Sequence, residues 1–429
     1  MDVVATLRST FSGGGLQRGN RGVHRSLEKV ELGAGVSSGV GASREAPVRV
    51  HAYAWRRDGR RGSCFNRQSA GEWCTAVDRM PHAAATPKLT LRAREGARFA
   101  CSGSGLCCTD IHGLGLLTKS EVRELRKRRP LSVVYNDELD GFCLKPVDSH
   151  CIYLEDERCS IHAQAGSAAK PGGCRRFPYG LVRTPQGGRV TTEHRCPCRT
   201  LGDRPPVSLQ DADASLRDRA GRLDVDFDVP ARIALERGKR VSFDAYAKIE
   251  SKIIARLNAG ERAEDVLAAS PLPTLASSTW TAIAVEHIDT RDATAGGEAF
   301  GWFGDALLHL ASGHTPPQRP RPWHAGFERA LAGSRERPNP EAIYNDWLAD
   351  EIWMFRWWSW GPFDVARAEL ATRLAVARCV QGWIEQHGVS AGQAAAEAVM
   401  ICELAAEGSE WPSAVASIQR SPSPAKPLQ

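Results

Sequence analysis

The amino-acid sequence predicts a mainly α-helical protein in which an irregular, cysteine-rich metal-binding module with few short strands precedes a helical C-terminal domain. Two observations favour this fold class. Nine of the thirteen cysteines fall within residues 89–204, where turn residues interrupt the apolar runs. Beyond Pro205 and Pro206, apolar residues recur at helical spacing, with no strand pattern of any length and no internal repeat. We therefore expect four parts, namely 1–88, 89–204, 205–420 and 421–429.

The first and last of these parts are expected to be disordered. Residues 1–88 are rich in Gly, Ser and Arg and hold few apolar residues in periodic order. Residues 1–98 carry 17 Lys or Arg against 8 Asp or Glu, so the basic character of the chain belongs to this end. The folded part is therefore not expected to bind nucleic acid. The Gly-rich stretch 29–43 is interpreted as a loop, because its third glycine is one residue late for G-x-G-x-x-G.

The sequence lacks the patterns of a transmembrane segment and of a secretory signal, and this predicts the location of the protein. No run of about 18 apolar residues is present, so we expect no transmembrane segment. The start, MDVVATLRST, is unlike a secretory signal, which favours a cytoplasmic protein. In a reducing compartment, clustered cysteines are more often metal ligands or reactive thiols than disulfides.

Helix signals follow in order along the chain. The segment 118–129 has a Ser/Thr cap and Glu121 in its first turn, and 242–260 places an apolar face before a stop at Gly260. Asn339 and Pro340 are typical of a helix start, and Ser390 with Gln393 forms a capping-box pattern. The further predicted helices are 297–313, 339–361, 363–388 and 390–408.

Five tryptophans fall within 14 residues of the predicted helix 339–361. They are Trp347, Trp353, Trp357, Trp358 and Trp360. The simpler interpretation is a buried aromatic seam between helices. The alternative is a surface for a protein partner, a membrane interface or a substrate.

The cysteines of residues 89–204 are candidate metal ligands. Thiolates are strong ligands for zinc and for iron–sulfur clusters, and such a centre can stabilise a segment that lacks a large core. The candidates are Cys101, Cys107, Cys108, Cys143, Cys151, Cys159, Cys174, Cys196 and Cys198. Disulfides or redox-sensing thiols are the alternatives, and the odd count argues against disulfides. Cys379 and Cys402 lie in helix patterns and are expected to be buried as small apolar residues.

Charged neighbours of these cysteines allow two interpretations. Arg175, Arg176, Arg195 and Arg199 lie beside cysteines, where they could donate hydrogen bonds to sulfur or simply be solvated. The alternative ligands are His112, His150, His162 and His194.

The cysteine-rich segment resembles the YkgJ-type cysteine-cluster proteins. Their pattern begins F-x-C-x-x-C-x-x-C-C, continues with C-x-I-[YH] and ends near C-R-x-F-P. FACSGSGLCC, CIYLEDERCSIH and CRRFP supply the matching residues Phe99, Cys101, Cys107, Cys108, Cys151, Cys159 and Cys174. The resemblance implies a domain that chelates zinc or iron. However, Ser104 stands at the position of the second cysteine, and serine is a poor ligand for soft metals. Cys143, Cys196 or Cys198 replaces it in space, or one coordination position is open.

The helical half carries a weaker resemblance. IYNDWLADEIWMFRWW, with the long helix and the Ala- and Glu-rich helix that follow, is similar to the C-terminal part of flagellin lysine N-methylases. This resemblance implies transfer of methyl groups from S-adenosylmethionine to lysines of a protein substrate. No separate methyltransferase glycine motif is found in the predicted folded part.

Three functions are therefore open at the level of sequence. The first is a protein whose zinc or iron–sulfur centre is structural or redox-active. The second is an S-adenosylmethionine-dependent protein-lysine N-methyltransferase, and the third is a zinc-stapled module for protein interaction. Cysteine serves zinc and iron–sulfur alike, so the metal stays undecided.

Overall fold

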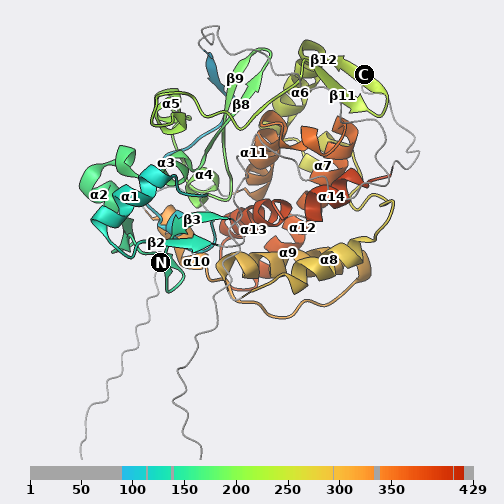
Figure 1. Cartoon of the computed structure of the whole chain (residues 1–429). Coiled ribbons are helices and arrows are strands. Elements are labelled where there is room, and N and C mark those ends of the chain that lie inside the picture. The colour runs from blue at the N-terminus through green and yellow to red at the C-terminus, as the bar shows by residue number, and fades with distance from the viewer. Residues whose placement is uncertain are drawn as a thin grey trace, which may run out of the picture. The chain divides into compact units, whose positions relative to one another are not determined.

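The computed structural model describes residues 89–112, 115–136, 140–292, 294–332, 339–408 and 410–419 (Figure 1). All of them belong to one unit, which spans residues 49–429. The predictions for 1–88, including the loop at 29–43, and for the tail 421–429 lie outside the described residues. Helices dominate and strands are few and short, so the mainly α fold class is confirmed. Below, residues 89–204 are called the cysteine region and residues 205–419 the helical region.

A four-stranded sheet has the strand order β1-β9-β8-β10. Its strands are β1 (Leu91–Ala93), β8 (Tyr179–Thr184), β9 (Gly187–Thr192) and β10 (Phe227–Asp228). The strands β8 and β9 form an antiparallel hairpin, while β1 pairs in parallel with β9 and β10 in parallel with β8. The sheet thus takes strands from both sides of Pro205.

The rest of the cysteine region consists of two-stranded hairpins and short helices. The hairpins pair β2 (Val133–Asn136) with β3 (Gly141–Leu144), β4 (Pro146–Val147) with β5 (His150–Cys151), and β6 (Leu154–Glu155) with β7 (Arg158–Cys159). The helices are η1 (Leu106–Cys108), α1 (Lys119–Arg128), α2 (Ser160–Ala165), η2 (Ser167–Ala169), α3 (Gly172–Arg176) and α4 (Pro197–Thr200). The predicted capping box of α1 is present, with Thr118 and Glu121 bonded reciprocally.

The helical region is built from helices, most of which pack around one large core. They are α5 (Leu209–Leu216), α6 (Phe243–Asn258), α7 (Ala263–Leu267), α8 (Trp280–Asp289), α9 (Ala295–Ser312), α10 (His324–Leu331), α11 (Pro340–Trp353), η3 (Arg356–Ser359), α12 (Phe363–Glu385), α13 (Ala391–Ala406) and α14 (Glu410–Ala416). The caps at Asn339 and Ser390 are confirmed, and Gly260 follows α6 with a φ of +80°. The hydroxyl of Ser390 accepts from the Gln393 backbone, whereas the Gln393 side chain donates to Glu397.

Two sequence expectations for this half are wrong. The helix predicted over 339–361 ends at Trp353, because Phe355 adopts a left-handed conformation with a φ of 58° and a separate short helix, η3, follows. The half also contains strands, since β11 (Arg232–Glu236) and β12 (Lys239–Ser242) form an antiparallel hairpin. These strands are too short for an alternating pattern to stand out in the sequence.

The tryptophan-rich segment is mostly buried, as the simpler interpretation expects. Trp347 and Trp357 are buried and belong to the core, and Trp353 and Trp360 are partly buried against it. Trp358 is the exception, with 37% of its surface exposed. As for membrane insertion, we find in the described part of the chain no helix that combines the length and the apolar character needed to cross a bilayer.

Candidate metal centre

The candidate cysteines are distributed over short elements and loops of the cysteine region, and all of them are free thiols. Cys101 precedes η1, Cys107 and Cys108 end η1, Cys143 lies in β3, Cys151 in β5, Cys159 in β7, Cys174 in α3, Cys196 directly before α4 and Cys198 within α4. None of these elements is long enough to bury a core of its own. The positions of the thiols therefore depend on how the loops approach one another.

Gly105 brings η1 against the turn between β6 and β7. Its φ of 74° is left-handed, and a Cβ at this position would lie 3.1 Å from the carbonyl oxygen of Glu157. Arg329 of α10 holds the same two segments, since its Nε donates to the Ser104 carbonyl at 2.7 Å and its Nη2 lies 3.0 Å from the Glu157 carboxylate. This close approach places the thiols of η1 beside Cys159.

A first group of thiols consists of Cys101, Cys196 and Cys198. Hydrogen bonds from Cys101 and then Cys196 lower the pKa of the Cys198 thiol, and their contacts with Cys198 raise the pKa of both partners. Ser102 completes the surroundings, with its Oγ 3.1 Å and its backbone nitrogen 3.5 Å from the Cys198 sulfur. Cys198 is thus the thiol of this group that ionises first.

Ser104 lies directly beside this first group. The Cys198 sulfur lies 3.7 Å from the Ser104 hydroxyl, and both residues are buried. Ser104 stands at the position where the resembling family has its second cysteine, and of the three cysteines considered as its replacement, Cys198 is the one that touches it. We find Cys196 hydrogen-bonded to Cys198, whereas Cys143 is separate.

A second group consists of Cys107, Cys108 and Cys159. A hydrogen bond from Cys108 lowers the pKa of the Cys159 thiol to about 5, although burial opposes the shift. Backbone N–H groups of His162 and Ile161, in the first turn of α2, act in the same direction. Contacts with Cys107 and then Cys159 raise the pKa of Cys108, which is therefore the proton donor of the group.

Two further thiols and one lysine adjoin these groups. Burial raises the pKa of the Cys151 thiol to about 11, and burial followed by the charge of Cys151 raises that of Cys174. The charge of Cys107 acts on both of them and also on members of the first group, so Cys107 links the two groups. Lys170 lies among them, and although burial opposes it, the charges of Cys107 and Cys159 raise the pKa of its ammonium group.

Cys143 lies apart from the other candidates. It faces Val134 in the β2–β3 ladder and is half-buried. Burial raises the pKa of its thiol, and no other cysteine contributes to that shift. Six of the nine candidates are therefore joined by hydrogen bonds in two groups, Cys151 and Cys174 interact with them through charge, and Cys143 does neither.

These thiols have the chemistry of ligands for a soft metal, but in this structure their positions do not form a metal-binding geometry. Within the described ranges, no three His, Cys, Asp or Glu side chains form a group that could hold a metal ion. The sulfurs are instead linked by hydrogen bonds from protonated thiols. Zinc and iron–sulfur clusters bind thiolates, so occupation requires these protons to leave. Such a centre would supply strong bonds between loops that otherwise share few apolar contacts.

Contrary to both sequence interpretations, the arginines beside the cysteines form ion pairs and hydrogen bonds with other segments of the protein. Arg199 is fully buried and pairs with Asp346 and Asp350 of α11, with 2.6 Å between its Nη1 and Asp346. Arg94 pairs with the same two carboxylates, its Nε lying 2.6 Å from Asp350. Burial opposes ionisation, yet the charges of Arg199 and Arg94 hold the pKa of Asp350 below its ordinary value. The pairs join α4 to α11, whatever ligand the thiols take.

Arg195 belongs to a second buried ionic cluster at the same junction. It pairs with Glu193 and Glu407, at 2.5 and 2.7 Å, and its backbone nitrogen donates to Glu403 at 2.6 Å. Burial raises the pKa of Glu403 to about 8, against the attraction of Arg356. Arg176 pairs with Asp224 and Asp226, and Arg175 donates to the Arg217 carbonyl. All four arginines thus join separate segments of the chain through ion pairs or hydrogen bonds.

The histidines take structural positions. His194 is buried and shares a 2.9 Å hydrogen bond with Asp350, and burial followed by the charge of Arg199 lowers its pKa to about 4. His112 is buried with its ring centroid 4.9 Å from that of Phe177. His150 is exposed and shares a hydrogen bond with the Asp148 carbonyl, and His162 is exposed as well. Of these residues, His162 reaches the thiols through its backbone N–H.

Three comparisons were made with known proteins, and they found no matching family model, no matching curated protein and no matching solved structure. The resemblances noted in the sequence therefore remain expectations.

Sequence reasoning missed Lys170, Asp346 and Asp350. Lys170 lies eleven residues after Cys159 in a run of small residues, AQAGSAAKPGG, where it is the basic residue closest in sequence to Cys174 on its N-terminal side. That position could have indicated that Lys170 lies near the thiols. The two acids are separated by one helical turn, which indicates a shared face but names no partner.

Proposed function

We propose that this protein binds zinc or an iron–sulfur cluster through cysteines of the cysteine region. The proposed ligands come from Cys101, Cys107, Cys108, Cys151, Cys159, Cys174, Cys196 and Cys198. The observation that carries the proposal is a set of thiol hydrogen bonds between residues spread over 98 positions of the sequence. They join Cys198 to Cys101 and Cys196, and Cys108 to Cys107 and Cys159. Metal analysis separates zinc from iron, and the number of centres follows from the stoichiometry.

The protein's own groups have defined tasks in this proposal. Hydrogen bonds from neighbouring thiols lower the pKa values of Cys198, Cys107 and Cys159, so these three favour the thiolate form that a metal binds. Lys170 offsets part of the negative charge that several thiolates create. Cys198, in contact with Ser104, takes the place of the missing family cysteine. When bound, the metal supplies bonds that hold the loops together, or a redox couple if it is an iron–sulfur cluster.

Anaerobic purification followed by an absorption spectrum and metal and sulfide analysis tests this proposal. We expect stoichiometric zinc without visible absorbance, or iron and sulfide with it. Cys107→Ser should lower the metal content, whereas Cys143→Ser, the matched control, should not. Reduced and folded protein with neither bound metal nor visible absorbance would refute the proposal.

A second candidate is an S-adenosylmethionine-dependent protein-lysine N-methyltransferase. One observation supports it, namely that ion pairs join the two regions that carry the resemblances. The segment of the second resemblance, IYNDWLADEIWMFRWW, carries Asp346, Asp350 and Arg356, which pair with Arg199, His194 and Glu193 of the cysteine region. The two resembling segments are therefore in direct contact.

Incubation with S-adenosylmethionine labelled in its methyl group and a lysine-rich protein tests this candidate. Transfer of label to lysine supports it, and loss of transfer in Cys107→Ser but not in Cys143→Ser connects it to the thiols. Stoichiometric zinc without transfer favours the third possibility, a zinc-stapled module for protein interaction.

A further inference from the structure

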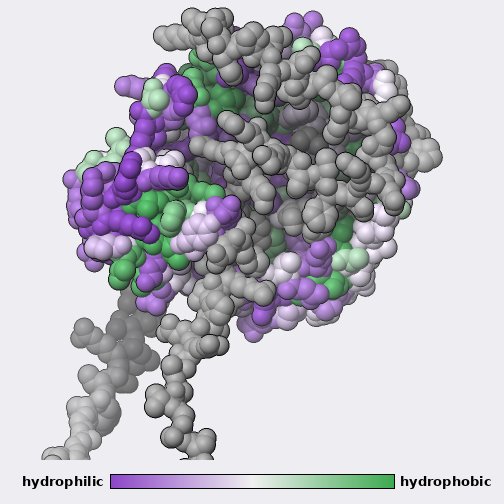
Figure 2. Space-filling model, viewed as in Figure 1, coloured by the Kyte–Doolittle hydropathy of each residue, from purple (hydrophilic) through white to green (hydrophobic). Residues whose placement is uncertain are grey.

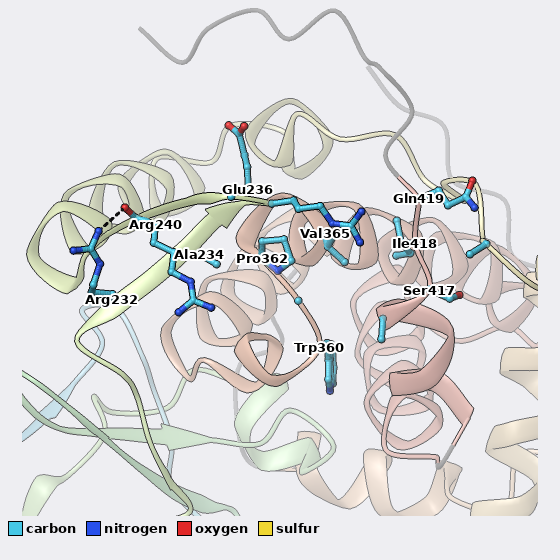
Figure 3. A pocket seen from close by; sticks show the side chains of 15 residues that line it. Arg232, Ala234, Glu236, Arg240, Trp360, Pro362, Val365, Ser417, Ile418 and Gln419 are labelled. Carbon is cyan, nitrogen blue, oxygen red and sulfur yellow. Dashed lines mark hydrogen bonds between the residues drawn. The ribbon is translucent and has the colours of Figure 1, made fainter. Parts of the chain in front are cut away.

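A pocket of about 1130 Å³ opens between the β11–β12 hairpin, the start of α12 and the chain that follows α14 (Figure 3). All the residues that line it belong to the helical region, so it is separate from the thiols. Pockets for small molecules usually measure about 300–1000 Å³. A ligand considerably larger than an inorganic anion therefore has room here.

The pocket has an apolar side. Trp360, Pro362, Val365 and Ile418 contribute to it, as Figure 3 shows. The backbone of this wall is already hydrogen-bonded, because Gln419 donates to the Thr274 carbonyl at 2.7 Å and Ala276 to the Ser417 carbonyl at 3.0 Å. Apolar surface and the Trp360 indole are therefore what this wall offers, and a flat ring makes the largest contact with an indole.

The hairpin gives the pocket a basic side. Arg232, Arg237 and Arg240 line it, while the one acid of the lining, Glu236, lies 3.6 Å from the Lys239 ammonium. Among the described residues, no carboxylate forms an ion pair with any of these three arginines. Arg232 donates to the Arg240 carbonyl at 3.3 Å, which leaves further guanidinium N–H groups for a ligand (Figure 3).

The two end segments of the chain are not complementary in charge to this pocket. The sequence after Gln419 reads RSPSPAKPLQ and has two basic residues and no acid. Residues 1–88 carry 14 Lys or Arg against 7 Asp or Glu. Both would be repelled by a site with three arginines and one paired acid. An anionic ligand from outside the chain is the complementary occupant.

We propose that this pocket binds a small anionic ligand with a flat aromatic ring, of the mononucleotide class. The ring lies against Trp360 and its apolar neighbours, and the phosphate accepts hydrogen bonds from Arg237 and Arg240. Guanidinium groups bind phosphate through paired N–H donors, which gives the site its preference for that group. This binding is independent of any metal held by the cysteines.

Isothermal titration of the full chain with AMP tests the proposal, with adenosine and inorganic phosphate as the two half-ligands. We expect AMP to bind at least about tenfold more tightly than either, since only AMP engages both sides of the pocket. R237A/R240A should weaken AMP by about 10- to 100-fold and leave adenosine unchanged. W360F should weaken AMP and adenosine but not phosphate, because a smaller ring offers less contact.

Matched controls exist on the same molecule. R123A/R128A removes two exposed arginines of α1, and W358F changes an exposed tryptophan that does not line the pocket, so both should bind AMP normally. Circular dichroism checks the fold of each variant. No saturable AMP binding, AMP binding no tighter than phosphate, or equal AMP affinity in R237A/R240A would each overturn the proposal.

Discussion

The cysteine region and the helical region are stabilised by different means. In the helical region, the helices from α6 to α14 enclose one large core, in which Phe303, Trp347 and Leu374 are essentially inaccessible. In the cysteine region, the hairpins and short helices between η1 and α3 contain a cluster of three buried apolar residues, Leu125, Tyr153 and Ile161.

The surface of the two regions reflects the same difference. Most of the large apolar side chains exposed on the described residues lie between residues 116 and 147, and Figure 2 shows apolar surface around this part, left of centre. These residues are Leu116, Leu131, Val134, Tyr135 and Val147. A segment that leaves so much apolar surface in water gains little stability from burial. The comparison teaches that the thiols between η1 and α3 lie where the apolar core is smallest, whereas Cys196 and Cys198 are themselves buried in a larger apolar cluster with Phe99 and Leu181.

The largest expected effect comes from Cys107→Ser or from metal removal by a chelator. If a metal staples the cysteine region, its loss should unfold the segment from η1 to α3, because structural zinc contributes about 10–16 kcal/mol in small metal-dependent domains. The helical region should stay folded on its own core. Amide hydrogen exchange should then show lost protection in α1 and β3 but retained protection in α12.

The control for this prediction is Cys143→Ser, which changes a half-buried thiol of the same region that lies apart from the others. It should keep full protection. Equal protection of α1 with and without metal would instead show that the cysteine region is stable without a staple, and the comparison would fail.

How far the sequence predicts this arrangement depends on the kind of interaction. The helices α1 and α13 were predicted from their caps and α12 from its apolar periodicity, because these signals act within one or two turns of the chain. The break at Phe355 was missed, since a left-handed aromatic residue has no local signal. Ligand candidates could be recognised from residue type and spacing. Cys198 adjoins Ser104 and Cys143 lies apart because of the way the loops pack. Loop packing of this kind cannot be predicted from a single sequence.

The next largest effect should follow from Asp350→Asn, which tests the junction between the regions. Asp350 is buried and neutralises Arg94 and Arg199, so its loss leaves an uncompensated charge inside the protein. Breaking such a buried pair costs about 3–5 kcal/mol. Urea unfolding followed by circular dichroism measures the change.

The matched control is Asp203→Asn, in the exposed pair between Arg98 and Asp203, whose side chains are 46% and 65% exposed. Removing an exposed pair should cost less than about 1 kcal/mol. Equal effects of the two substitutions would mean that the buried network does not hold the regions together.

A smaller effect is expected from Glu403→Gln, at the second ionic cluster. Burial raises the pKa of Glu403 to about 8, so the folded protein retains a proton that the unfolded chain has lost above about pH 4.5. The stability from this group is present at low pH and declines as the pH rises towards 8. Unfolding free energies at about pH 6 and pH 8 should differ by about 2 kcal/mol more in the wild type than in the variant. An unchanged pH dependence in Glu403→Gln would assign the titration to another group.

The smallest effect, and the sharpest for the cysteine region, concerns Ser104. Because the Cys198 sulfur lies 3.7 Å from the Ser104 hydroxyl, the two positions offer a ligand to the same place. Cys198→Ser should weaken metal binding, and adding Ser104→Cys to it should restore affinity by roughly tenfold, about 1.4 kcal/mol, in a competition with a chromophoric chelator. The same Ser104→Cys substitution added to Cys174→Ser serves as the control and should restore nothing, since among the described residues the Ser104 hydroxyl contacts Cys198 and not Cys174. Recovery in both double variants would show that any added thiol helps, whereas recovery confined to the Cys198 background would identify Cys198 as the thiol that supplies the ligand in place of Ser104.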